Sequence, residues 1–332
     1  MSASVGLLAS EIARERLEGE VTALAAQVSP GVQIQWVKAN DPSAKLASVQ
    51  VAFVSRDVTG LSTKQMILPQ TQAFYDALAS ASQLRWLNIH SAGMDRMIYQ
   101  ELAARGVNVT TSPGTNARNV AQTALAGLLA LARRFPLLTR AQHAHEWAPL
   151  YGAQMPRDLA GQTALVIGWG EIAQRLAGYL AMLEFKVIVV RKKSHLSAGD
   201  FETIGLAQLD EVLPGVDWLI LACPLTPETQ GLIDETRLRR LPVSASLINI
   251  ARGQIVDEAA LISALTEKRL SGAFLDVFEH EPLSSQSPLW DLPNVILTPH
   301  SAGFSKGNEA RVDALFLSRF RLCLEAFSIS SS

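Results

Sequence analysis

The stretch that decides the fold is Leu165-Val166-Ile167-Gly168-Trp169-Gly170-Glu171-Ile172-Ala173. A short β-forming run leads into a G-x-G-x-x-A loop, and a helical stretch begins near Ile172. In such a loop the first glycine permits a tight turn, the second lets backbone approach a pyrophosphate, and a small third residue lets the helix pack on the strand. The free N–H groups that begin the helix then favour a phosphate. In this strand–loop–helix setting the motif predicts dinucleotide binding, with a purely structural turn as the alternative.

The residues after the second strand of this unit indicate which dinucleotide is bound. An NAD site usually carries Asp or Glu there, which accepts a hydrogen bond from the ribose 2′-hydroxyl. Here 187–190 is followed by Arg191, Lys192 and Lys193, with no carboxylate among them. Three cations suit a 2′-phosphate, which a guanidinium binds well. We therefore expect NADP(H) as the preferred cofactor and NAD(H) as the second candidate; the alternative is an exposed basic turn.

Short β-forming runs alternate with helix-like stretches on both sides of the glycine loop, as is typical of parallel βαβ units. A turn cluster at Ser112-Pro113-Gly114 separates two sets of runs. After Pro299 only one helical stretch, 308–327, follows. Because a lone helix must dock on something, we expect it to return to the N-terminal unit. The β-forming runs are 32–37, 49–54, 84–89 and 107–110 in the first set, and 165–168, 187–190, 218–222, 246–250, 273–277 and 295–297 in the second.

Length and composition agree with two globular domains. The chain has 332 residues, of which 48% are hydrophobic and 18% charged, which is enough apolar material for a sizeable core. Its net charge of −2 leaves no electrostatic footprint for nucleic acid or an anionic membrane, so neither is expected as a partner. The longest apolar run, 120–132, is too short to span a bilayer. With only Cys223 and Cys323, and no zinc-ligand spacing, we expect a cytoplasmic protein without a metal.

The remaining motifs resemble those of the D-isomer-specific 2-hydroxyacid dehydrogenases, and along most of the chain those of the glyoxylate/hydroxypyruvate reductase (2-ketoacid reductase) branch. Six motifs occur in the family order, which makes chance agreement improbable. They are the substrate loop Ser91-Ala92-Gly93-Met94-Asp95, the glycine loop 168–173, the adenosine-side segment 223–229 (CPLTPET), the arginine motif 249–253 (NIARG), the acidic motif 276–283 (DVFEHEPL) and the histidine motif 298–303 (TPHSAG).

The resemblance implies two flavodoxin/Rossmann-like, doubly wound parallel-sheet α/β domains with the active site in the cleft between them. The substrate-binding domain would be discontinuous, comprising 1–112 and 304–332, and the dinucleotide-binding domain would comprise 113–303. The family relation also implies a homodimer. Trp147 lies in a segment that reaches a neighbouring subunit's site in related reductases, although core packing is an equal alternative for it.

Three residues carry the expected chemistry of reducing a 2-oxo acid. His300 suits the general acid, because its ordinary pKa is nearest the working pH. Glu281, rather than the nearby Glu279, would hydrogen-bond the far imidazole nitrogen and fix its tautomer. Arg252 offers a planar fork to the substrate carboxylate and its adjacent keto oxygen.

The resemblance assigns supporting roles around this catalytic set. Ala92, Gly93 and Met94 would form the substrate loop, with backbone N–H groups of Gly93 and Met94 on the carboxylate, beside Arg252 and His300. Asp276 would meet the nicotinamide carboxamide. The other expected cofactor-binding residues are Gly168, Trp169, Gly170, Glu171, Ile172, Arg191, Lys192, Lys193, Cys223, Pro224, Thr229, Ile250, Ala251 and Gly303.

These observations favour an NADPH-preferring reductase that converts small 2-oxo acids, such as glyoxylate or hydroxypyruvate, into (R)-2-hydroxy acids. One alternative is an NAD-dependent D-2-hydroxyacid dehydrogenase with a bulkier substrate. Another is a corepressor-like scaffold that senses nucleotides with the same fold.

Overall fold

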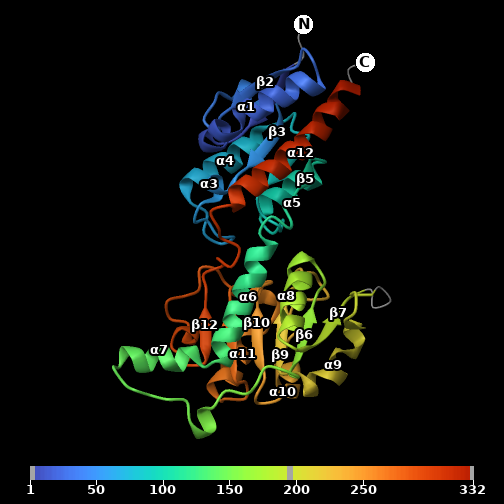
Figure 1. Ribbon diagram of the computed structural model, residues 1–332. Coiled ribbons are helices and arrows are strands. Elements are labelled where there is room, and N and C mark those ends of the chain that lie inside the picture. Colours follow the sequence, from blue (N-terminus) through green and yellow to red (C-terminus); the bar gives the residue numbers. More distant parts are fainter. Residues whose placement is uncertain (1–3, 193–196, 330–332) are drawn as a thin grey trace. The chain divides into compact units, whose positions relative to one another are not determined.

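The computed structural model describes residues 4–192 and 197–329 (Figure 1). The chain divides into two compact units. Unit 1 contains the residues up to Thr115 together with those from Ser305 onward, and unit 2 is Asn116–Phe304. The division expected from the sequence, after residues 112 and 303, lies close to these limits.

Unit 1 is built on a five-stranded parallel sheet with the order β2-β1-β3-β4-β5. This is the flavodoxin-like strand order of a doubly wound sheet. All strands are parallel, and the order in which the chain adds them changes side between β1 and β3. The sequence patterns missed β1, because its run is short, contains Gly6 and lies close to the chain start. It nevertheless occupies the second position of the sheet and pairs with both β2 and β3. The strands are β1 (Ser4–Leu8), β2 (Gln33–Val37), β3 (Val49–Val54), β4 (Trp86–Ile89) and β5 (Asn108–Thr110).

Helices cover both faces of this sheet. One face packs against α1 and α12, where Phe316 of α12 stacks on Phe53 of β3 and on Trp86 of β4. The ion pair between Arg16 and Asp313 (2.8 Å) ties α12 to α1, and Figure 1 shows the two helices side by side. The opposite face packs against α4 and α5. The helices are α1 (Glu11–Val28), α2 (Ser43–Ala47), α3 (Arg56–Thr59), α4 (Pro69–Ser80), α5 (Met97–Ala104) and α12 (Asn308–Ile329).

Unit 2 is built on a seven-stranded parallel sheet with the order β12-β11-β10-β9-β6-β7-β8. The order contains the Rossmann arrangement 3-2-1-4-5-6, with β6 as its first strand and one further strand at the edge. The sequence patterns missed β8, which has only three residues and a polar start. The strands are β6 (Thr163–Ile167), β7 (Lys186–Val190), β8 (Glu202–Ile204), β9 (Trp218–Leu221), β10 (Ser246–Asn249), β11 (Gly272–Leu275) and β12 (Val295–Leu297).

Alternate residues of these strands enter two separate cores. Val166 and Ile220 face α6 and α8, whereas Leu165 and Leu219 face α9, α10 and α11. Because the strands are parallel, the loops that follow them gather at one edge of the sheet. The helices are α6 (Ala117–Ala132), α7 (Phe135–His143), α8 (Glu171–Met182), α9 (Leu209–Val212), α10 (Glu235–Arg240) and α11 (Glu258–Thr266), with 3-10 turns at Gly152–Gln154, Leu206–Gln208, Leu213–Gly215, Gly253–Ile255 and Pro288–Trp290.

Among the helices of the described residues, none combines the length and apolarity needed to cross a membrane.

Candidate active site

His300 lies in a tight turn directly after β12. Its backbone adopts a φ of 50°, in the left-handed region that non-glycine residues rarely occupy. Its N–H group donates to the carbonyl oxygens of Asp276 (2.8 Å) and Thr298 (2.9 Å). A strained backbone held by such bonds is typical of functional turns, and here it fixes where the imidazole projects.

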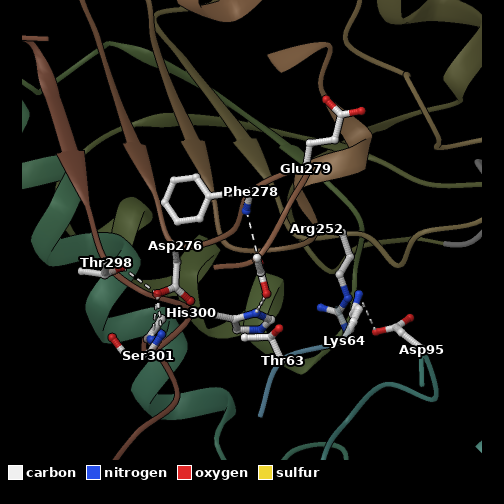
Figure 2. A network of polar contacts seen from close by, with 12 residues as sticks. Thr63, Lys64, Asp95, Arg252, Asp276, Phe278, Glu279, Thr298, His300 and Ser301 are labelled. Carbon is white, nitrogen blue, oxygen red and sulfur yellow. Dashed lines mark hydrogen bonds and ion pairs between the residues drawn. The ribbon is translucent and has the colours of Figure 1, made fainter. Parts of the chain in front are cut away.

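The Asp276 carboxylate, directly after β11, stabilises this turn by accepting hydrogen bonds from it. Its Oδ1 accepts hydrogen bonds from the Thr298 hydroxyl (2.6 Å), the Ser301 N–H (2.8 Å) and the Ala302 N–H (3.0 Å) (Figure 2). Burial raises the pKa of Asp276, while these donors and the charge of His300 act in the opposite direction. The sequence suggested a contact with the nicotinamide carboxamide; one carboxylate oxygen is already engaged in shaping the histidine turn.

Glu281 orients the imidazole. Its Oε2 lies 2.8 Å from His300 Nδ1, and its Oε1 accepts from the Phe278 N–H at 3.2 Å. The carboxylate is thus held at both oxygens and keeps Nδ1 protonated, so Nε2 is the nitrogen that can exchange a proton with a ligand. Glu279 differs: Figure 2 shows its side chain pointing away from His300.

Arg252 follows β10 in a loop that Asn249 braces. The buried Asn249 amide donates to the Arg252 carbonyl oxygen (3.1 Å) and accepts from the Ala251 N–H (3.1 Å). Arg252 Nη1 donates to the Ala251 carbonyl oxygen at 2.6 Å. Asn249 belongs to the motif that identified Arg252, but the sequence did not show that its side chain shapes the loop.

The loops after β10 and β11 interlock at Gly253. A Cβ atom on Gly253 would lie 1.9 Å from the carbonyl carbon of Phe278, so only glycine permits this approach. The Gln254 side chain donates to the Glu279 carbonyl oxygen at 2.6 Å. The positions of Arg252 and of the Glu281 loop are therefore coupled through backbone contact, which residue spacing alone did not reveal.

The glycine loop has the shape that a coenzyme pyrophosphate needs. Gly168 has a φ of 106°, and a Cβ there would lie 2.6 Å from the Ala222 carbonyl oxygen. Gly170 is the N-cap of α8 and has open space where a Cβ would stand, which leaves room for a ligand at the helix N-terminus. Ala173 is fully buried against the sheet. These residues fit a dinucleotide on steric and electrostatic grounds.

Other residues expected near the cofactor have largely structural contacts. Thr229 accepts from the Thr226 N–H (2.8 Å) and donates to the Pro224 carbonyl oxygen (2.7 Å), which closes the turn after β9. Burial raises the pKa of Cys223 to about 11, so its thiol is a packing group. The remaining predicted residues lie as follows: Ile250 and Ala251 are buried after β10, Trp169 packs edge-on against Phe201, Glu171 and Ile172 begin α8, and Gly303 lies against the Asn116 side chain.

In the basic segment after β7, Arg191 is half-buried and Lys192 is exposed, and both side chains make contacts. Arg191 Nη1 donates to the Ser197 carbonyl oxygen at 2.7 Å. Lys192 Nζ lies 2.8 Å from Glu228 Oε1. Lys193 lies outside the described residues. No pattern in the sequence indicated that a carboxylate from the loop after β9 pairs with this segment.

The expected substrate loop of unit 1 lies beside a cluster that sequence reasoning missed. Ser91 Oγ donates to the Gly93 carbonyl oxygen (2.9 Å), while Ala92 is exposed and Met94 packs partly against the core. Asp95 pairs with Lys64 at 3.3 Å, which Figure 2 also shows. Arg96 donates to the Thr63 carbonyl oxygen (2.9 Å) and so fastens the Lys64 loop beside Asp95.

Two further residues, Trp147 and His90, have clear environments. Trp147 is 96% exposed, so the core-packing alternative is wrong for this chain. His90 contacts the Thr59 hydroxyl at 2.9 Å, and burial followed by the charges of Arg56 and Arg96 lowers its pKa to about 3. It is a neutral packing histidine at ordinary pH.

Within the described ranges no cluster of His, Cys, Asp or Glu side chains could hold a metal ion.

Comparison with known proteins agrees with this architecture. Residues 125–302, more than half of the chain, match the sequence model described as D-isomer specific 2-hydroxyacid dehydrogenase, NAD binding domain. The chain belongs to the D-isomer specific 2-hydroxyacid dehydrogenase family. Within that family it is 35% identical to the glyoxylate reductase of Pyrococcus furiosus over 230 residues, which covers 68% of each chain.

Two further relatives place the chain within the family. It is 33% identical to D-3-phosphoglycerate dehydrogenase of Mycobacterium tuberculosis, covering 90% of this chain; the chain spans about half of that relative's length (53%). The structure of a D-isomer specific 2-hydroxyacid dehydrogenase from Xanthobacter autotrophicus Py2, in complex with NADPH and MES, aligns with a TM-score of 0.70 and 28% identity, and covers 98% of this chain and 95% of that one.

Proposed function

We propose that this family member is an NADPH-preferring reductase of small 2-oxo acids, with glyoxylate and hydroxypyruvate as leading substrates and (R)-2-hydroxy acids as products. The observation that carries the proposal is the Glu281–His300 pair, with 2.8 Å between Oε2 and Nδ1, on a turn that Asp276 fastens. A carboxylate-oriented imidazole at the carboxyl edge of a dinucleotide-binding sheet suits an acid that protonates a reacting oxygen.

The proposed reaction adds a hydride and a proton across the C2 carbonyl. A bound nicotinamide coenzyme supplies the hydride, with its two electrons, to C2. His300 gives the Nε2 proton to the carbonyl oxygen as negative charge develops there, and the C=O bond becomes C–OH. Glu281 stabilises the imidazolium before transfer and keeps the ring in the productive orientation afterwards.

Two further groups would recognise the substrate carboxylate. Arg252, positioned by Asn249, presents a guanidinium whose paired N–H groups match a carboxylate and its neighbouring keto oxygen. The backbone N–H groups of Gly93 and Met94 in unit 1 would donate hydrogen bonds to the substrate carboxylate. Ala92 completes that loop.

The NADPH preference is supported by Arg191 and Lys192 at the end of β7, where an NAD site usually carries a carboxylate. One charge-assisted hydrogen bond to a 2′-phosphate is worth about 1.5–3 kcal/mol, or roughly a ten- to hundredfold preference. The Xanthobacter relative was crystallised with NADPH, which is in keeping with this assignment.

We also propose a homodimer in the cytoplasm. Between α7 and the start of β6, large apolar side chains are exposed, including Trp147, Tyr151 and Met155. An exposed apolar patch of this kind favours a protein partner, and a second copy of the chain is the partner that the family relation suggests. Light scattering on the wild type would detect the dimer, and Trp147→Ala should weaken it.

A screen of 2-oxo acids with both coenzymes tests the proposal. Turnover of a small 2-oxo acid with NADPH supports it, whereas turnover only of a bulky acid with NADH supports the dehydrogenase alternative. An absence of turnover with any 2-oxo acid leaves the nucleotide-sensing scaffold.

The Arg252→Lys variant tests the substrate-binding role in the same assay. A point ammonium cannot contact two oxygens with the same planar fork, so kcat/KM for the 2-oxo acid should fall by at least about tenfold. Coenzyme affinity, measured by fluorescence titration, should stay within about twofold. Near-normal kcat/KM in this variant would contradict bidentate recognition.

A further inference from the structure

The ion pair between Lys192 and Glu228 has an unusual place in the sheet. Lys192 follows β7, and Glu228 lies in the loop that follows β9. In the sheet, β6 stands between these two strands, and β6 ends in the glycine loop. The 2.8 Å contact between Lys192 Nζ and Glu228 Oε1 therefore reaches across the end of the strand that would carry the coenzyme pyrophosphate.

Both side chains of the pair are exposed, and the carboxylate is ionised under working conditions. The Lys192 and Glu228 side chains are 76% and 52% exposed. Lys192, and after it the Thr226 side chain, lowers the pKa of Glu228 to about 2, so the carboxylate is ionised at neutral pH. The ionised Glu228 carboxylate is thus already paired with Lys192 at the sheet edge where we place a 2′-phosphate. The neighbouring Arg191 donates to the Ser197 carbonyl oxygen.

We infer that Glu228 is a specificity-determining residue for the nucleotide, because its carboxylate competes with a ligand's 2′-phosphate for Lys192. A dianionic phosphate must displace the carboxylate from Lys192 before it can pair with that lysine, which disfavours binding. A nucleotide that carries only a 2′-hydroxyl meets no such competition. Glu228 thereby weakens the NADPH preference that the cations of this segment create. The inference rests on the proposed function only in assigning this edge to the adenosine ribose.

Binding of coenzyme fragments tests the inference without any turnover. Adenosine 2′,5′-bisphosphate and 5′-AMP are titrated by calorimetry into the full-length wild type and into Glu228→Gln, Lys192→Gln and the double variant. Glu228→Gln should bind the bisphosphate about two- to fivefold more tightly, the range expected for one exposed ion pair. Lys192→Gln should bind it at least about tenfold more weakly, since a charge-assisted contact is lost. Affinity for 5′-AMP should change less than about twofold in each variant.

The double variant separates competition from a general charge effect. If Glu228 acts through Lys192, then Glu228→Gln should have no effect on bisphosphate affinity when residue 192 is already glutamine. The gain in the single variant should also shrink as salt is raised, because the groups are exposed. An equal gain in both backgrounds, or no gain in the single variant, overturns the inference.

Glu202→Gln is the matched control. Glu202 forms a comparable exposed pair with Lys186 (3.3 Å), but this pair lies at the amino ends of β7 and β8, the opposite edge of the same strands. The substitution removes the same charge and should leave the affinity of both nucleotides unchanged. A tightening equal to that of Glu228→Gln would show a net-charge effect and overturn the inference. Failure of the wild type to bind either nucleotide would instead overturn the assignment of this edge, and with it the proposed function.

Discussion

The turn that carries His300 and the basic segment after β7 lie at the same edge of one sheet but are held in opposite ways. The histidine turn is fastened by a buried carboxylate, Asp276, with three hydrogen bonds on one oxygen. In the basic segment, the half-buried Arg191 donates to the Ser197 carbonyl oxygen and the exposed Lys192 pairs with Glu228. Buried bonds fix a geometry whatever the solvent, whereas exposed charges give a preference that salt can change. We therefore expect substitutions at the first region to abolish chemistry and those at the second to alter only nucleotide choice.

The largest effect is expected for His300→Ala. Loss of a general acid typically costs about 10²–10⁴-fold in rate, about 3–5 kcal/mol. Steady-state kinetics should show this loss in kcat, while coenzyme affinity measured by fluorescence changes little. Wild-type turnover in this variant would remove His300 from the mechanism and with it the contrast between the two regions.

The interlock beneath the catalytic loops should be nearly as sensitive. In Gly253→Ala the new Cβ would approach the Phe278 backbone to 1.9 Å, so the Arg252 and Glu281 loops must separate. We expect a fall in kcat/KM of about 10²-fold, as for a misplacement of about 1 Å, and a loss of stability of about 1–3 kcal/mol in urea denaturation. Gly178→Ala in α8 is the control, because nothing lies within 4 Å of its Cβ position. Equal activity in both alanine variants would contradict a role for the interlock.

At the basic segment, the triple change Arg191→Asp, Lys192→Ala and Lys193→Ala should alter nucleotide choice alone. The ratio of kcat/KM for NADPH to that for NADH should fall by roughly ten- to hundredfold, because at least one charge-assisted bond is lost. Turnover with NADH should be largely retained. In the wild type the ratio should decrease as salt rises. A wild type that uses both coenzymes equally at low salt would show that these cations form only an exposed turn.

The smallest effect concerns the charge of Asp276. Burial raises the pKa of Asp276 in the folded state. At a pH above the ordinary aspartate pKa, the unfolded state therefore binds fewer protons at this residue than the folded state does. The free energy of unfolding then falls as pH rises toward the higher folded-state pKa. Asparagine keeps the accepting oxygen and has no such dependence. The melting temperature of Asp276→Asn relative to the wild type should therefore increase as the pH rises above about 4. A relative melting temperature that falls over this range would contradict a raised pKa.

Local sequence predicted most strands of both sheets, because buried parallel strands are short apolar runs bounded by turns. It missed β1 and β8, whose runs are short and interrupted by glycine or polar residues. Their pairing depends on neighbouring strands that lie far along the chain. The same limit applies to Gln254 and Lys64, whose partners Glu279 and Asp95 lie in other loops. It also applies to Asn249, whose hydrogen bonds depend on the exact path of its own loop.

The sequence by itself determined the family motifs, the glycine loop and the candidate residues His300, Glu281 and Arg252, since these signals lie in consecutive residues. Only the tertiary structure decided how the residues are held: that Asp276 fastens the histidine turn, that Gly253 admits the Phe278 backbone, and that Glu228 pairs with Lys192. Hydrogen bonds and ion pairs act over about 3–4 Å in space. Sequence spacing does not specify such distances between residues from different strands, and the packing of parallel strands does.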